Sequence, residues 1–133
     1  MQAVDHLSVI FCALAVRPLG DWVTAGPGGA AVIVPGRRFG DYLATMCGLI
    51  RRYGSAEPTL SIALLRLLDD CAVVLPADPA RFSALAEQAD LIVADATRDT
   101  AQPADLRQVK AAADHLKTII ATHRSGHADS TSR

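Results

Sequence analysis

The sequence has few aromatic residues, no closely spaced cysteines and no long hydrophobic run, and each shortage excludes a class of protein. Aromatic residues make up 5% of the 133 residues, while 24 of the apolar residues are alanine. A core of alanine and leucine favours closely packed helices over a β-sandwich, which needs more valine, isoleucine, tyrosine and threonine. The strongest apolar run, Val9–Val16, is far shorter than the roughly 20 residues that span a bilayer.

The three cysteines are Cys12, Cys47 and Cys71, which are widely separated and form no Cys-x-x-Cys pair. We therefore predict neither a zinc site nor a redox dithiol, but three reduced thiols that act as small core residues. Reduced thiols fit a cytoplasmic compartment. The formal net charge of −1 argues against nucleic-acid binding, which normally requires a basic excess.

Apolar residues at three- and four-residue spacing, together with prolines that open helices, predict five helical segments. The first covers about Ala3–Val16 and the second about Phe39–Tyr53, with Gly54 expected in a left-handed conformation at its end. Pro58, Pro79 and Pro103 open the other three, whose apolar faces extend to Leu75, Ala96 and Ile120. We predict an all-α fold, a bundle of about five helices, as a single domain over residues 1–124 with a disordered tail over 125–133.

One β-hairpin is predicted between the first and second helices. β-Branched runs at Asp21–Thr24 and Ala30–Val34 flank the loop Ala25–Gly29. The glycines of this loop could also form a phosphate-binding turn. However, a dinucleotide fingerprint has a helix after its glycines, whereas here a strand follows them, and this order favours a simple loop.

The first helix is apolar on nearly all sides, since only Ser8 interrupts the run from Leu7 to Val16. Such a helix must be covered all round, either by a central position in the bundle or by a partner. We predict that it leaves apolar surface exposed and mediates a homodimer. The predicted interface residues are Leu7, Ile10, Phe11 and Leu14.

No catalytic, cofactor-binding or metal-binding residues are predicted. His6 and His115 each follow an aspartate directly, and adjacent residues on a helix point about 100° apart, so neither pair resembles a catalytic dyad. His123 and His127 have the spacing of a helical metal pair but no third ligand nearby. We interpret the histidines as surface or half-buried residues, and we expect no enzyme activity.

Charge is unevenly distributed along the chain. Residues 17–52 contain five arginines and two aspartates, whereas residues 57–114 contain ten acidic and five basic residues. The basic half could form an anion site or face phospholipid head groups, or it could pair with the acidic half of the same chain. The candidate ligand-binding residues are Arg37, Arg38, Arg51, Arg52 and Tyr53.

Short motifs in the first half of the chain resemble the C-terminal part of a bacterial family. They are Arg51-Arg52-Tyr53-Gly54 followed by Pro58 and Leu64-Leu65, Asp5-His6-Leu7, Arg17-Pro18-Leu19, the run from Val32 to Pro35, and Phe39-x-Asp41-Tyr42-Leu43. The family is the predicted membrane proteins catalogued as domain of unknown function 2254, and the resemblance covers roughly Gln2–Leu116. It implies transmembrane helices and a further segment upstream, so we expect a piece of a longer protein or a shortened relative. It implies no activity, cofactor or catalytic residue.

Two functions follow as expectations. The first is a non-catalytic soluble domain of a bacterial membrane protein that mediates assembly or regulation, on the cytoplasmic side of the inner membrane. Its partners would be a second copy and the upstream segments, and only the larger protein would contact the membrane. The alternative is a small-molecule or anion sensor that uses the arginine-rich face. A deep polar pocket lined by Arg37, Arg51 and Arg52 would favour the sensor, whereas an apolar face near Leu7 and Phe11 would favour assembly.

Overall fold

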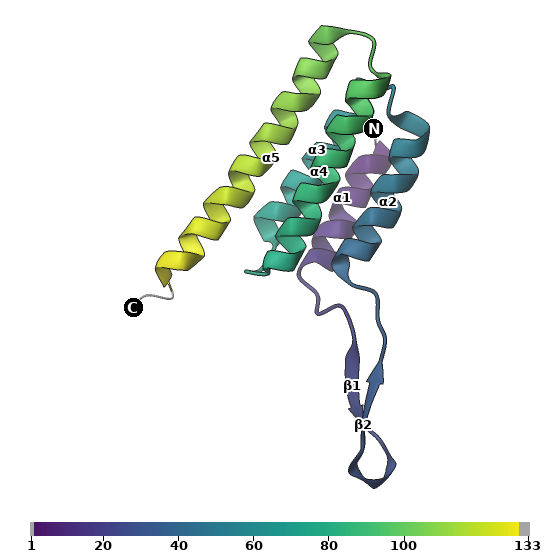
Figure 1. Cartoon of the computed structure of the whole chain (residues 1–133), viewed down its shortest axis with the longest axis vertical. Coiled ribbons are helices and arrows are strands. Elements are labelled where there is room, and N and C mark those ends of the chain that lie inside the picture. Colours follow the sequence, from purple (N-terminus) through teal and green to yellow (C-terminus); the bar gives the residue numbers. More distant parts are fainter. Residues whose placement is uncertain (1, 131–133) are drawn as a thin grey trace.

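Five helices and a two-stranded hairpin form the fold in a computed structural model that describes residues 2–130. The hairpin lies between the first two helices, and the predicted all-α bundle is confirmed (Figure 1). The elements are α1 (Gln2–Ala15), β1 (Trp22–Ala25), the 3₁₀ turn η1 (Pro27–Gly29), β2 (Ala31–Val34), α2 (Phe39–Gly54), α3 (Pro58–Val74), α4 (Pro79–Asp99) and α5 (Pro103–Ser130).

Helix α3 is the centre of the bundle. It packs against α5, α1 and α4 and touches α2 more lightly, while α2 packs mainly on α4. Because neighbouring helices surround α3, it buries side chains on more than the one apolar face that three- and four-residue spacing predicts. Leu65 joins Leu64, Leu67 and Leu68 in the core, and all four are at most 1% exposed. Val74, which the predicted stripe included, is 41% exposed at the end of the helix.

Prolines and local polar groups define the helix starts, as the sequence predicts. The Asp78 carboxylate accepts hydrogen bonds from the backbone N–H groups of Ala80 and Arg81, at 3.0 and 3.4 Å. These are donors that the first turn of α4 would otherwise leave unpaired. Gly54 differs from its prediction, because it is helical rather than left-handed. A Cβ at this position would collide with the Leu60 side chain, so the glycine allows α2 and α3 to approach closely.

Helix α5 continues to Ser130, beyond residue 125 where the predicted tail begins, while the division into a domain over residues 1–124 and a tail over 125–133 stays a prediction. Serine and threonine hydroxyls in this part bond the carbonyl one turn earlier, as Ser125 Oγ does to Ala121 O at 3.1 Å. Elongating a helix that is already formed adds one backbone hydrogen bond for each residue that it fixes, so polar composition alone does not end it. Residues 131–133 of the predicted tail lie outside the described residues.

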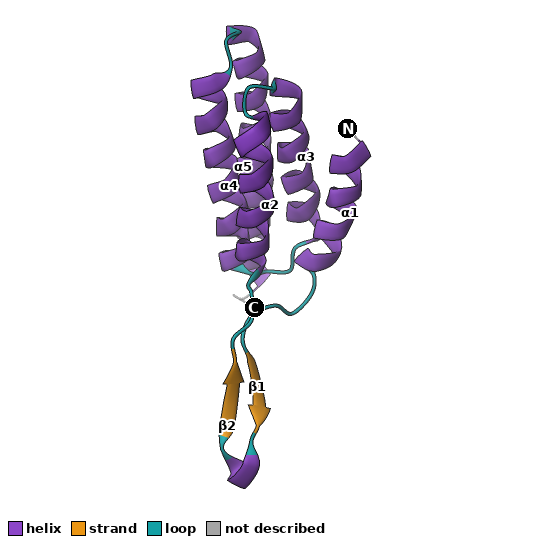
Figure 2. Ribbon diagram, turned by 90° about the vertical axis from the view of Figure 1, so that its right-hand side faces the viewer, coloured by secondary structure: helices purple, strands orange, loops and turns teal. Residues whose placement is uncertain are grey.

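The hairpin projects from one end of the bundle as a separate arm (Figures 1 and 2). Its strands are antiparallel, with Trp22 opposite Val34 and Val23 opposite Ile33. At its tip the Gly26 N–H donates to the Ala30 carbonyl at 2.6 Å. Gly28 and Gly29 have positive φ angles of 75° and 80°, which explains the glycines of the loop by turn geometry. Neither strand packs extensively on any helix.

Candidate interaction surface

Helix α1 is covered on one side only. It packs on α3 and scarcely contacts α2, so it lies at the edge of the bundle (Figure 2). Its inward face buries Val4, Phe11 and Ala15. On its outward side, Val9 is 72% exposed and Ile10 is 54% exposed. The structure thus leaves on α1 the uncovered apolar surface that its sequence predicts.

A shallow apolar groove lies between α1 and α2 and is floored by the start of α3. We call it the α1/α2 groove; it is lined by Ala3, Val4, Leu7, Leu49, Ile50, Tyr53, Gly54 and Leu60. Leu49 is 61% exposed and Tyr53 is 81% exposed. Every lining side chain except that of Tyr53 lacks polar atoms, so the groove offers almost no hydrogen-bonding groups. It is suited to an apolar partner rather than to a charged ligand.

The predicted interface residues fall in different environments. Leu7 lines the groove and is half-buried, and Leu14 is also half-buried. Ile10 is exposed beside the groove residues on the same helix. Phe11 lies in the core with 6% of its surface exposed, and this corrects its assignment as an interface residue. The sequence analysis did not single out Leu49, because helical periodicity does not show which residues beside an apolar face meet another helix.

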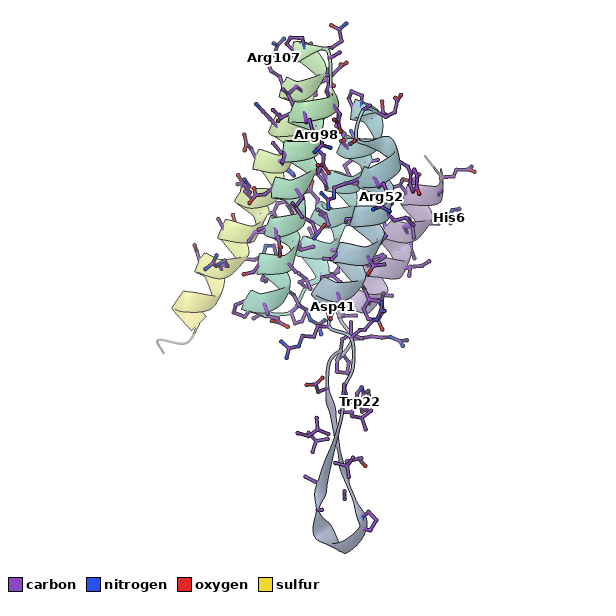
Figure 3. All side chains as sticks on the ribbon, turned by 45° about the vertical axis from the view of Figure 1, so that its right-hand side comes forward. His6, Trp22, Asp41, Arg52, Arg98 and Arg107 are labelled. Atoms are coloured by element: carbon purple, nitrogen blue, oxygen red, sulfur yellow. The ribbon has the colours of Figure 1, made fainter. Side chains whose placement is uncertain are left out.

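The candidate arginines do not converge on one site. Arg37 and Arg38 precede the first residue of α2, whereas Arg51, Arg52 and Tyr53 lie near its other end. Arg51 follows Arg37 by fourteen positions, which corresponds to about 20 Å along a helix axis. Figure 3 shows Arg52 on the bundle well away from the arm. Five cavities of residues 2–130 were compared, and none of these five is lined by Arg37, Arg51 or Arg52.

Part of the basic half pairs with the acidic half. Arg51 Nη1 lies 2.8 Å from Asp95 Oδ2, and both side chains are more than 80% buried. Asp95 also pairs with Arg98 at 3.2 Å. Arg98 contacts Asp99, and Ser55 Oγ donates to Asp99 at 2.5 Å. The Arg98 guanidinium and the Ser55 hydroxyl lower the pKa of the Asp99 carboxyl. This network joins α2 to α4, so Arg51 has a structural role and is not open to a ligand.

Arg81 closes the opposite end of the bundle, and the sequence analysis did not single it out. Its guanidinium donates to the carbonyls of Ala15 and Arg17 at 2.5 and 2.6 Å. It also pairs with Asp78 at 3.0 Å and lies 5.6 Å from the centre of the Phe39 ring. The only sequence signal was the aspartate three residues earlier. Arg81 thereby ties the end of α1 to the starts of α2 and α4, where the arm begins.

A cavity of about 430 Å³ lies beside Arg81 at the base of the arm. Its charged lining residues are Arg38, Arg81, Asp21, Asp41 and Asp78. The guanidinium of Arg81 is already bonded to two carbonyls and to Asp78, and three carboxylates face two cations. This balance does not favour an anion.

The cysteines and histidines do not form a reactive group in the described part of the chain. Cys47 and Cys71 are buried, Cys12 is half-buried, and all three are free thiols. Burial raises the pKa of the Cys47 thiol from 9.0 to about 12. His115 Nδ1 lies 3.1 Å from Asp69 Oδ2 on the surface. No cluster of three or more potential metal ligands occurs among residues 2–130.

Comparison with known proteins places these features in a family. The model of a family described as predicted membrane protein, domain of unknown function 2254, matches residues 1–70. The chain belongs to this family. The predicted resemblance is thereby confirmed at the level of the family, while its assignment to the C-terminal part stays a prediction. Within residues 2–130, no helix combines the length and the apolar character needed to cross a bilayer.

Three curated relatives are similar over nearly the whole chain. They are uncharacterized proteins of Mycobacterium bovis and of two Mycobacterium tuberculosis strains. Each is 37% identical over 121 residues, which cover 90% of this chain but 23% of the relative. The chain therefore spans about a quarter of the length of the relatives. No solved structure matches it.

Proposed function

We propose that this chain is a non-catalytic assembly module of a bacterial membrane protein and that a second copy of the chain occupies the α1/α2 groove. The observation that carries the proposal is the one-sided packing of α1, which leaves Ile10 and Leu49 exposed around an apolar groove. Burial of apolar surface stabilises association by about 25 cal/mol per Å² before the entropy cost of binding. A symmetric dimer would cover the groove of each copy with the α1 of the other.

The proposal also gives a role to the upstream segments that the longer family proteins are expected to have. Upstream segments would cover the remaining outward side of α1, including Val9, which lies outside the groove lining. In this proposal the module lies on the cytoplasmic side of the inner membrane. We propose no nucleic-acid partner, because the net charge of the chain is close to zero. The sensor alternative has less support, because Arg51 forms an ion pair with Asp95 and the candidate arginines are far apart.

Sedimentation of a charged groove variant tests the proposal. We expect the native chain to form a dimer at micromolar concentration, and Leu49→Lys to raise the dissociation constant at least tenfold, because a buried lysine would lack a partner. Val73→Lys is the matched control, since Val73 on α3 is 62% exposed against 61% for Leu49. A native chain that remains monomeric, or equal effects of the two variants, would contradict the proposal.

A further inference from the structure

The projecting arm has no charged side chain over its whole length. The fourteen residues from Trp22 to Pro35 include neither acidic nor basic residues. Trp22, Val23 and Ile33 are 65%, 71% and 65% exposed, so the arm presents large apolar side chains to solvent. An isolated two-stranded hairpin is marginally stable in water. The exposed apolar surface therefore indicates that something other than water surrounds the arm in the working protein.

Both faces of the arm are apolar. Trp22 and Val34 form one cross-strand pair, and the next pair, Val23 and Ile33, points to the opposite face. A hairpin that rests on a flat protein surface needs only one apolar face, with polar residues on the other. The arm instead extends away from the helices with apolar residues all round (Figures 1 and 2). Its surroundings must therefore be apolar on every side.

The base of the arm has a small basic excess, since Arg17, Arg37, Arg38 and Arg81 lie there with Asp21, Asp41 and Asp78. Arg17, Arg37 and Arg38 flank it and are exposed, and no ion pair involves them in the described part of the chain. The neighbouring acids are engaged with the backbone. Asp21 accepts from the Gly36 N–H at 3.1 Å, and Asp41 accepts from the Arg38 N–H at 2.9 Å. Figure 3 shows Trp22 on the arm and Asp41 at the adjoining end of the bundle.

From these observations we propose that the arm inserts into an anionic phospholipid leaflet, with the three arginines against the head groups. The order along the arm matches the polarity of a leaflet: an uncharged tip and strands, then Trp22, then Asp21 bonded to the Gly36 N–H, and then the arginines. Tryptophan prefers the membrane interface, and arginines next to a membrane bind anionic lipids. A protein partner would explain the apolar faces but not this order. The proposal adds direct membrane contact to the expectation that only the larger protein touches the membrane.

The length of the arm suits shallow insertion. Four-residue strands extend about 13 Å, while the head-group region of one leaflet is roughly 5–8 Å thick. The tip would therefore pass the head groups and reach only the outer acyl chains. At this depth, water and lipid head groups can bond the outward N–H and C=O groups of the two strands. Deeper insertion would leave these backbone groups without hydrogen-bond partners.

The position of the only tryptophan in the chain makes the test direct. Vesicles of phosphatidylglycerol and phosphatidylcholine should shift the Trp22 emission to shorter wavelength, and vesicles of phosphatidylcholine alone should bind far less. Because Trp22 lies at the base of the arm, lipids that carry a quencher on the head group should quench its emission more strongly than lipids brominated on the acyl chains. No shift with either vesicle would overturn the proposal. A shift without vesicles that grows with protein concentration would also overturn it, because that result indicates pairing of arms between copies.

Matched variants separate the parts of the proposal. Arg17→Gln and Arg37→Gln together should weaken binding to anionic vesicles about 25-fold, because each arginine contributes about fivefold. Arg107→Gln is the control, since Arg107 lies at the far end of the bundle, and it should have much less effect (Figure 3). Ile33→Asp should abolish the emission shift without loss of helical circular dichroism. An equal effect of Arg107→Gln, or unchanged binding of Ile33→Asp, would contradict insertion.

The groove variant distinguishes this inference from the proposed function. Leu49→Lys lies at the opposite end of α2 from the arm, so it should bind vesicles as the native chain does. Loss of dimers with retained vesicle binding would support both proposals. Dimers that persist without any vesicle binding would leave assembly intact and overturn insertion alone.

Discussion

The helices α2 to α5 and the segment formed by α1 and the arm are built on different principles. In the first region, each helix packs on at least one neighbour and buries its leucines, as α3 does with Leu64 and Leu68. In the second, α1 has one covered side, and the arm has none. The difference teaches that apolar residues serve two purposes in this chain. In the bundle they stabilise the fold, whereas in α1 and the arm many of them remain exposed to solvent.

The largest expected effect is in the bundle core. Leu68→Ala should reduce the free energy of unfolding by about 3–4 kcal/mol, because it removes a completely buried side chain and leaves a cavity. Denaturant unfolding followed by circular dichroism measures this loss. Ile10→Ala on the open side of α1 provides the comparison and should cost less than about 1 kcal/mol in the monomer. Equal losses of unfolding free energy in the two variants would contradict the distinction between the two regions.

A second, somewhat smaller effect concerns the buried thiols. The folded pKa of Cys47 is about 12 against 9.0 for a free thiol, so above pH 9 the unfolded chain loses this proton and the folded chain keeps it. Stability is therefore highest below pH 9 and falls toward pH 11, by roughly 2 kcal/mol from this group. Unfolding measured between pH 8 and pH 11 tests the slope.

Cys47→Ala should lower stability at pH 8 and make its decline above pH 9 less steep, while Cys71, whose pKa burial also raises, still contributes to the decline. A thiol reagent at pH 8 provides an independent check, because Cys12 is half-buried on α1 whereas Cys47 and Cys71 are buried. One thiol should react quickly and two slowly. Equal rates of modification at all three thiols would show that the Cys12 thiol is as inaccessible to the reagent as the two thiols buried in the bundle.

The smallest expected effect is in the arm. Val23→Ala and Ile33→Ala should each change the free energy of unfolding by less than about 0.5 kcal/mol, because both side chains are mostly exposed and their strands do not pack extensively on any helix. Thermal unfolding of the two variants in the absence of lipid measures the change. A decrease in the free energy of unfolding of more than about 1 kcal/mol would mean that the arm stabilises the bundle, and would contradict the difference drawn between the two regions.

The helices and the hairpin could be predicted because their signals are local. Pro58, Pro79 and Pro103 each begin a helix in the structure, and the glycines of the loop form the tip of the hairpin. Proline fixes its own backbone angle, and a cap acts within one turn, so neighbouring residues suffice to define these boundaries. One local prediction was wrong: Gly54 is helical and not left-handed, and its missing Cβ leaves room for the Leu60 side chain. Helix α5 also continues past Ser125, where the sequence predicts a tail.

The candidate site could be predicted only in part. The apolar excess of α1 is visible in its sequence, but the choice of which side meets α3 depends on the whole bundle. That choice buried Phe11 and exposed Ile10, and it brought Leu49 to the groove from a different helix. Periodicity gives the faces of a helix without naming the neighbour that covers each face.

The sequence by itself determined the family, the helical class, the helix starts at Pro58, Pro79 and Pro103, and the uncharged composition of the arm. Only the tertiary structure decided how the charges are used. Arg51 pairs with Asp95, 44 residues away, and Arg81 bonds carbonyls more than 60 residues earlier. Local conformation depends on nearby residues, whereas these contacts exist only after the helices have packed. The same packing left the α1/α2 groove and the arm uncovered, because no remaining element of the described chain reaches them.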